Sequence, residues 1–148
     1  MSLRERIEQD LKAAMRARDA TRLSAIRLLL AAVRQKEVDE RRELGDADTV
    51  AVVERLIRQR RESVAQYEQA RRSDLAAAER FEIEVLSAYL PERLSAEQLA
   101  DAVTQALAET GAASMRDMGR VMALLRPRLQ GRADMAVVSE LVRARLAG

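Results

Sequence analysis

Hydrophobic residues recur three and four positions apart along almost the whole chain, which is the pattern of amphipathic helices. No stretch shows the alternation of hydrophobic and polar residues that a β-strand requires. The pattern therefore predicts an all-α protein of about seven helices, with breaks near residues 18, 45, 72, 91, 112 and 132.

Local signals set several of these helix boundaries. Ser2 with Glu5, and Ser95 with Gln98, match the capping box, in which a serine and the third residue of a helix exchange hydrogen bonds. Pro91 cannot donate a backbone hydrogen bond and disfavours the α conformation at the preceding residue, so a helix should end just before it. These signals divide the chain into an N-terminal four-helix array, residues 1–91, and a C-terminal three-helix bundle, residues 92–148.

Packing within this plan follows from the same pattern. We expect three apolar residues around the joint to be buried between the two parts: Tyr89, Leu90 and Leu94. In the C-terminal part, Pro127 should prevent smooth continuation of the sixth helix, and Val137 should face inward on the seventh.

The composition excludes several kinds of active site. The absence of cysteine removes thiolate catalysis and Cys-ligated metals, and the absence of histidine removes the commonest general base and transition-metal ligand. Aromatic residues make up 2 % of the chain, which leaves no platform for stacking single-stranded bases. We therefore assign no catalytic residue, cofactor or metal, and a self-contained active site is not expected.

Charge and hydropathy narrow the choice of partner and compartment. The formal net charge is only +2, so nucleic-acid binding would need a local cluster of basic residues, and DNA is not expected. No apolar run approaches the roughly 20 residues that span a bilayer, and the first residues contain no apolar core of a secretory signal. The expectation from sequence is a cytoplasmic protein without a membrane segment.

Basic residues gather before the last helix. Arg126, Arg128 and Arg132 would surround the start of that helix, where free backbone amides favour an anion such as phosphate. Asp134 is a plausible cap of the same helix and is itself an anion, so a loop that satisfies its own charges is the alternative. A second cluster consists of Arg58–Arg61 with Arg71 and Arg72. We interpret it first as a solvated helical face.

Two further positions call for a partner. Gly119 falls inside the sixth helix, where glycine costs about 1 kcal/mol relative to alanine, so either another backbone segment of the chain, or a ligand or RNA backbone, should approach it closely. Arg60 interrupts the hydrophobic seam of the third helix, and Glu82 of the fourth is its possible partner.

The chain resembles the GatB/YqeY family, in particular its stand-alone YqeY-like members. The resemblance rests on seven short segments in order: Leu11–Met15, Arg22–Arg27, Arg61–Ser63, Asp74–Leu75, Tyr89–Pro91, Asp117–Met122 and Gly131–Asp134. It implies an all-helical protein whose C-terminal half is similar to the tail domain of the tRNA-dependent amidotransferase B subunit, a domain that helps to hold tRNA.

The resemblance implies a non-catalytic protein that binds tRNA, or that works beside an enzyme that charges or amidates tRNA. The nucleic-acid-binding residues would be Gly119, Arg120, Arg126, Arg128, Gly131 and Arg132. Two alternatives remain: an accessory to, or carrier of, a carbon–nitrogen ligase with glutamine as amido donor, and a protein-interaction module without RNA. Arg71 and Met135 stand where the family commonly has glycine, and Met135 makes the loop before it less free to approach a phosphate backbone.

Overall fold

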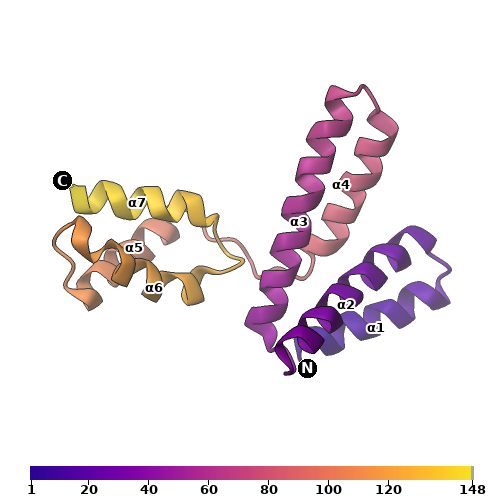
Figure 1. Ribbon diagram of the computed structural model, residues 1–148, viewed down its shortest axis with the longest axis horizontal. Coiled ribbons are helices and arrows are strands. Elements are labelled where there is room, and N and C mark those ends of the chain that lie inside the picture. Colours follow the sequence, from indigo (N-terminus) through magenta and orange to yellow (C-terminus); the bar gives the residue numbers. More distant parts are fainter. Residues whose placement is uncertain (148) are drawn as a thin grey trace. The chain divides into compact units, whose positions relative to one another are not determined.

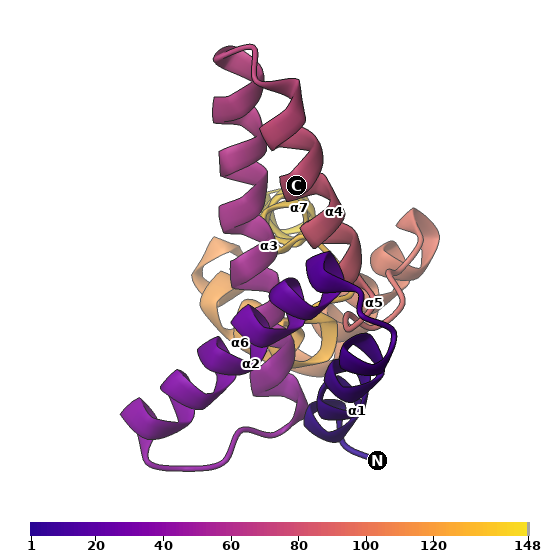
Figure 2. The same cartoon turned by 90° about the vertical axis from the view of Figure 1, so that its right-hand side faces the viewer.

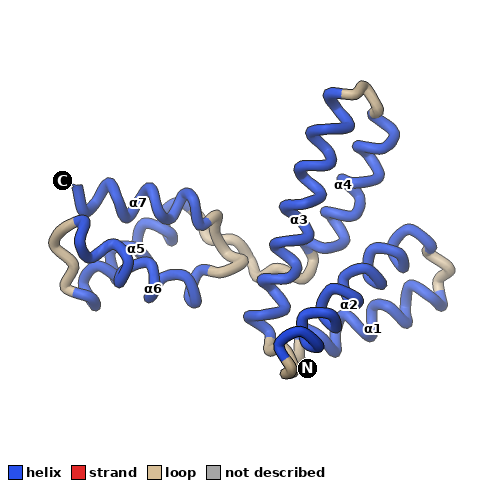
Figure 3. The backbone as a smooth tube through the Cα atoms, in the orientation of Figure 1, coloured by secondary structure: helices blue, strands red, loops and turns tan. Residues whose placement is uncertain are grey.

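The computed structural model describes residues 1–147, and within them the chain forms seven α-helices, one short 3₁₀ helix (η1) and no strand (Figure 1 and Figure 3). The prediction of an all-α protein is confirmed. The helices are α1 (Leu3–Arg16), α2 (Ala20–Glu40), α3 (Asp46–Gln69), α4 (Ser73–Ser87), α5 (Ala96–Thr110), η1 (Met115–Asp117), α6 (Met118–Leu129) and α7 (Met135–Ala147).

The chain divides into two compact units, Met1–Leu90 and Pro91–Gly148. The first unit holds α1 to α4, and α3 and α4 run side by side as a long hairpin in both views (Figure 1 and Figure 2). The second unit holds α5, η1, α6 and α7. Each unit has its own core of buried aliphatic side chains.

The helix starts follow the capping signals in the sequence. The Oγ atoms of Ser2 and Ser95 accept the backbone N–H of Glu5 and Gln98, each at 3.1 Å, and both capping boxes are complete. Asp134 caps α7, because its Oδ1 accepts the N–H of Ala136 at 2.9 Å. Such caps satisfy amides that a helix cannot satisfy internally, and each stabilises by about 1 kcal/mol.

Four helices end in the same backbone motif. After α1, α2, α3 and α5 one residue adopts the left-handed conformation, and the next residue donates its N–H to a carbonyl five positions back. Glycine, which suits this conformation, occupies the position only after α5, as Gly111 with φ 64°. Arginine occupies the other three positions, as Arg18, Arg41 and Arg71, with φ of 54–59°.

Two packing predictions in the second unit are wrong. The α6 helix continues through Pro127 to Leu129, because Pro127 and the residue one turn before it, Ala123, lie on the exposed side of the helix. The proline ring and the carbonyl that it leaves unpaired therefore face solvent. Val137 is 44 % exposed, because the inward face of α7 consists of Val138, Val142 and Leu146.

Two other packing predictions have different outcomes. Arg60 and Glu82 form the expected ion pair, with 2.7 Å between Nε and Oε2, although the N–H of Nε does not point along the contact as in a directed hydrogen bond. Tyr89 lies in the core of the first unit and Leu90 is partly buried against it, and Leu94 is partly buried against the core of the second. A common interface of these three residues stays a prediction.

No helix among residues 1–147 combines the length and the hydrophobicity needed to cross a bilayer.

Candidate nucleic-acid interface

The exposed side of α6 and η1 is a basic helical face. Val121, Met122 and Leu125 are buried in the core of the second unit and fix the orientation of α6. At about 100° per residue, positions 116, 119, 120, 123 and 126 then share the opposite side. All five are exposed, and we call them the α6 basic face: Arg116, Gly119, Arg120, Ala123 and Arg126.

Gly119 lies open at the surface of this face. A Cβ atom built at Gly119 would meet no heavy atom within 4 Å. Of the two reasons considered for a glycine here, close approach of another part of the chain is therefore absent among the described residues. With Ala123 one turn further on, Gly119 gives the face a shallow strip of small residues between arginine side chains.

Arg120 is tied to the start of the helix. Its NH2 atom lies 2.8 Å from Oδ1 of Asp117, and both groups stay in reach of solvent. The other oxygen of Asp117 accepts the backbone N–H groups of Ala113 and Ser114. These amides, and to a lesser extent Arg120, hold the pKa of Asp117 below its usual value. Asp117 thus fixes the loop that leads into α6 and leaves the outer part of the Arg120 guanidinium accessible.

The three arginines of the predicted phosphate loop do not converge on one point. Arg128 points to α5, where its NH1 lies 2.6 Å from Oε2 of Glu109. Arg132 donates from Nε to the carbonyl of Glu92 at 3.3 Å. Arg126 is exposed, and its side chain has no hydrogen bond or ion pair in the described part of the chain. The loop is thus largely satisfied by its own contacts, and Arg126 belongs to the α6 basic face.

Gly131 serves the path of the chain between α6 and α7. Its φ of 79° is a conformation that favours glycine, and it turns the backbone so that the carbonyl of Arg132 accepts the N–H of Leu94 at 2.9 Å. This hydrogen bond fastens the loop to the segment just before α5. The site residues predicted from sequence therefore fall into two groups: Gly119, Arg120 and Arg126 on the α6 basic face, and Arg128, Gly131 and Arg132 in internal contacts.

Two members of the α6 basic face, Arg116 and Ala123, were missed by sequence reasoning. The signal was available, because they fall one turn before and one turn after Gly119 and Arg120.

Comparison with known proteins identifies the family. The family model described as "Yqey-like protein" matches residues 4–146. The chain belongs to this family. The family resemblance drawn from the short sequence segments is thereby confirmed.

Curated relatives of this YqeY-like chain come from yeasts and related fungi and carry the name "Altered inheritance of mitochondria protein 41, mitochondrial". The protein of Eremothecium gossypii is 38 % identical over 97 residues, covering 64 % of this chain and 53 % of its own length. That of Kluyveromyces lactis is 37 % identical over 84 residues, covering 56 % and 45 %. That of Candida glabrata is 31 % identical over 105 residues, covering 68 % and 58 %. The chain spans about half the length of the curated relatives it matches.

These names correct the expectation of a cytoplasmic protein, because the relatives are named as mitochondrial. An apolar secretory signal and an apolar membrane segment bear only on secretion and membrane insertion. Mitochondrial targeting segments are instead amphipathic and rich in arginine, so the lack of an apolar run does not distinguish the cytoplasm from mitochondria.

Proposed function

We propose that this YqeY-like protein is a non-catalytic tRNA-binding protein and that it holds the sugar–phosphate backbone on the α6 basic face. The observation that carries the proposal is Gly119, a helical glycine whose cost is offset by no close packing in the described chain and which lies among exposed arginines. A backbone that must lie close to a helix is best accommodated where side chains are absent.

The charges of the face suit a polyanion. Arg116, Arg120 and Arg126 can each present a planar guanidinium to phosphate oxygens in a bidentate contact, which lysine cannot do. Asp117 is the one acidic residue between positions 116 and 126, and it is already occupied by two backbone amides and Arg120. The net charge of +2 for the whole chain therefore understates the local positive charge at α6.

The proposal also assigns roles to the remaining predicted residues. Arg128 and Arg132 would have to leave Glu109 and the carbonyl of Glu92 to reach phosphate, so they contribute less to binding than Arg126 does. Gly131 would affect binding only indirectly, because it sets the path of the loop between α6 and α7. The names of the curated relatives mention mitochondria and neither a nucleic acid nor a reaction, so they do not bear on this proposal. Its support comes from the family similarity to a tRNA-holding domain and from the geometry of α6.

Titration of the full chain with tRNA at several salt concentrations tests the proposal. Arg116→Ala, Arg120→Ala and Arg126→Ala should each weaken binding and reduce the salt slope by about 0.7–0.9, because each removes about one phosphate contact. Arg143→Ala is the matched control, since Arg143 is an exposed arginine of α7 in the same unit and outside the face. Its affinity and slope should equal those of the parent protein.

Three outcomes would decide against the proposal. Absence of tRNA binding at low salt overturns it outright. Equal losses for Arg143→Ala and the three face variants would show nonspecific attraction instead of a defined face. Amidation of misacylated tRNA by the purified chain would show an enzyme instead.

A further inference from the structure

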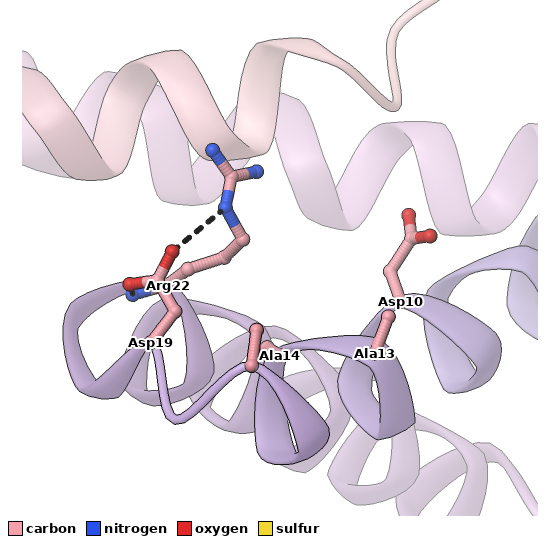
Figure 4. Close-up of a pocket in the computed structure, with 6 residues that line it drawn as sticks. Asp10, Ala13, Ala14, Asp19 and Arg22 are labelled. Atoms are coloured by element: carbon pink, nitrogen blue, oxygen red, sulfur yellow. Dashed lines mark hydrogen bonds and ion pairs between the residues drawn. The ribbon is translucent and has the colours of Figure 1, made fainter.

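The first unit contains an open pocket at the turn between α1 and α2, which the proposed function does not use. Its volume is about 310 Å³, at the lower end of the range of small-molecule pockets, which is roughly 300–1,000 Å³. Six residues line it: Asp10, Ala13, Ala14, Ala17, Asp19 and Arg22. All of these except Ala17 are labelled in Figure 4.

One end of the pocket is a held carboxylate. Oδ2 of Asp10 accepts a hydrogen bond from the hydroxyl of Tyr89 at 2.6 Å, and Tyr89 is only 4 % exposed. Arg6 lies over the Tyr89 ring, with its Cζ atom 5.1 Å from the ring centroid, and donates to the carbonyl of Ala88. These contacts fix Asp10, which lines the pocket, whereas its other oxygen has no hydrogen bond within the described residues.

The other end is a guanidinium. Nε of Arg22 lies 3.4 Å from Oδ2 of Asp19, and Oδ1 of Asp19 caps α2 by accepting the backbone N–H of Arg22. The two terminal nitrogens of Arg22 point away from Asp19 (Figure 4). They have no partner in the described part of the chain, so they can bind a carboxylate in the bidentate geometry that arginine favours.

Alanine side chains keep the space between these ends open. Asp10 and Arg22 reach out on the same side of the α1–α2 hairpin, with Ala13 and Ala14 between them (Figure 4). Ala13, Ala14 and Arg22 line the pocket and belong to two of the segments on which the family resemblance rests, Leu11–Met15 and Arg22–Arg27. Tyr89, which holds Asp10, belongs to a third, Tyr89–Pro91. The α6 basic face involves none of these segments.

We propose that this pocket binds a small zwitterion, such as a free amino acid, with its ammonium group on Asp10 and its carboxylate on Arg22. A lone amine would leave the terminal nitrogens of Arg22 unpaired, and a lone carboxylate would leave the free oxygen of Asp10 unpaired. A molecule with both charges satisfies both ends, and the alanine floor accommodates a short aliphatic body.

NMR titration of the ¹⁵N-labelled full chain provides the test, with glycine, β-alanine and γ-aminobutyrate as the zwitterionic probes. The three probes differ in the distance between their charges, so the tightest binder reports the spacing of the two ends. Ethylamine and propionate are the single-charge controls and should bind about tenfold or more weakly, because each lacks one charge-assisted contact. The shifts should centre on residues 10–22 and Tyr89.

Variants separate binding from folding. Asp10→Asn and Arg22→Gln should each reduce affinity for the best zwitterion at least about tenfold, while Arg34→Gln and Asp101→Asn, at exposed positions outside the pocket, should leave it unchanged. Ala13→Leu fills the pocket from an exposed position and should block binding without lowering the melting temperature.

Three results would overturn the proposal: no saturable shift with any zwitterion, equal affinity for a single-charge control, or shifts centred outside the pocket. The assay uses no RNA, so its outcome is independent of the tRNA experiment.

Discussion

Gly119→Ala should stabilise the protein and weaken its binding to tRNA. Gly119 is the second residue of α6, and a Cβ atom placed there meets no heavy atom within 4 Å. Alanine therefore gains its helix preference over glycine, about 0.5–1 kcal/mol, without steric cost. For a chain of this size that gain corresponds to a rise of roughly 1–4 °C in melting temperature.

The same methyl group should obstruct any RNA backbone that lies against α6. We expect the affinity for tRNA to fall, with an unchanged salt slope because no charge is lost. Denaturant unfolding and tRNA titration of the same preparations measure the two effects. Ala123→Gly is the reciprocal control on the same exposed face, since it should destabilise by a similar amount without obstructing RNA.

Two results would refute different parts of this reasoning. A destabilised Gly119→Ala protein would show that the site is not open in solution. A stabilised protein with full tRNA affinity would show that no RNA backbone approaches Gly119, and would remove the observation on which the proposed function depends.

Three other predictions concern stability. Arg41→Gly and Arg71→Gly should each stabilise by up to about 1 kcal/mol in denaturant unfolding, because glycine relieves the left-handed backbone strain, whereas Arg41→Ala should not stabilise. Burial, reinforced by the Asp10 hydrogen bond, raises the pKa of Tyr89 above its ordinary 10.0. The contribution of Tyr89 to folding stability is therefore complete below about pH 10 and declines above it. Tyr89→Phe should flatten this decline in alkaline unfolding curves. Because the pKa of Asp117 is lowered, its contribution to folding stability is present above its ordinary pKa of 3.8 and is lost as the pH falls below that value. Asp117→Asn should therefore reduce the dependence of the melting temperature on acid pH.

The features that were predictable from sequence are those encoded by neighbouring residues. The capping boxes at Ser2 and Ser95 and the Asp134 cap each depend on residues within one helical turn. The helices follow from hydrophobic spacing for the same reason. The Arg60–Glu82 pair was also predictable, because a charged residue in a hydrophobic seam requires a partner and Glu82 falls on the hydrophobic side of the next helix.

The features that sequence reasoning missed depend on contacts between distant segments. Arg128 and Arg132 were placed at one anion site, but Glu109 of α5 and the carbonyl of Glu92 hold them. Nothing in the residues near Arg128 indicates Glu109, which lies 19 positions away. The hydrogen bond that holds Asp10 at the pocket was missed similarly, because its donor, Tyr89, lies 79 positions away along the chain.

Ionic strength separates the two binding proposals in one protein. The α6 basic face attracts a polyanion, so its affinity should fall steeply with salt as counterions are released. The α1–α2 pocket would bind a ligand with one positive and one negative charge, so binding releases no counterions from a polyanion. The affinity for the zwitterion should therefore depend only weakly on salt. The sites lie in units with separate cores, so a variant in one should leave the binding curve of the other unchanged. A steep salt slope for zwitterion binding would therefore contradict the pocket even if the affinity were as expected.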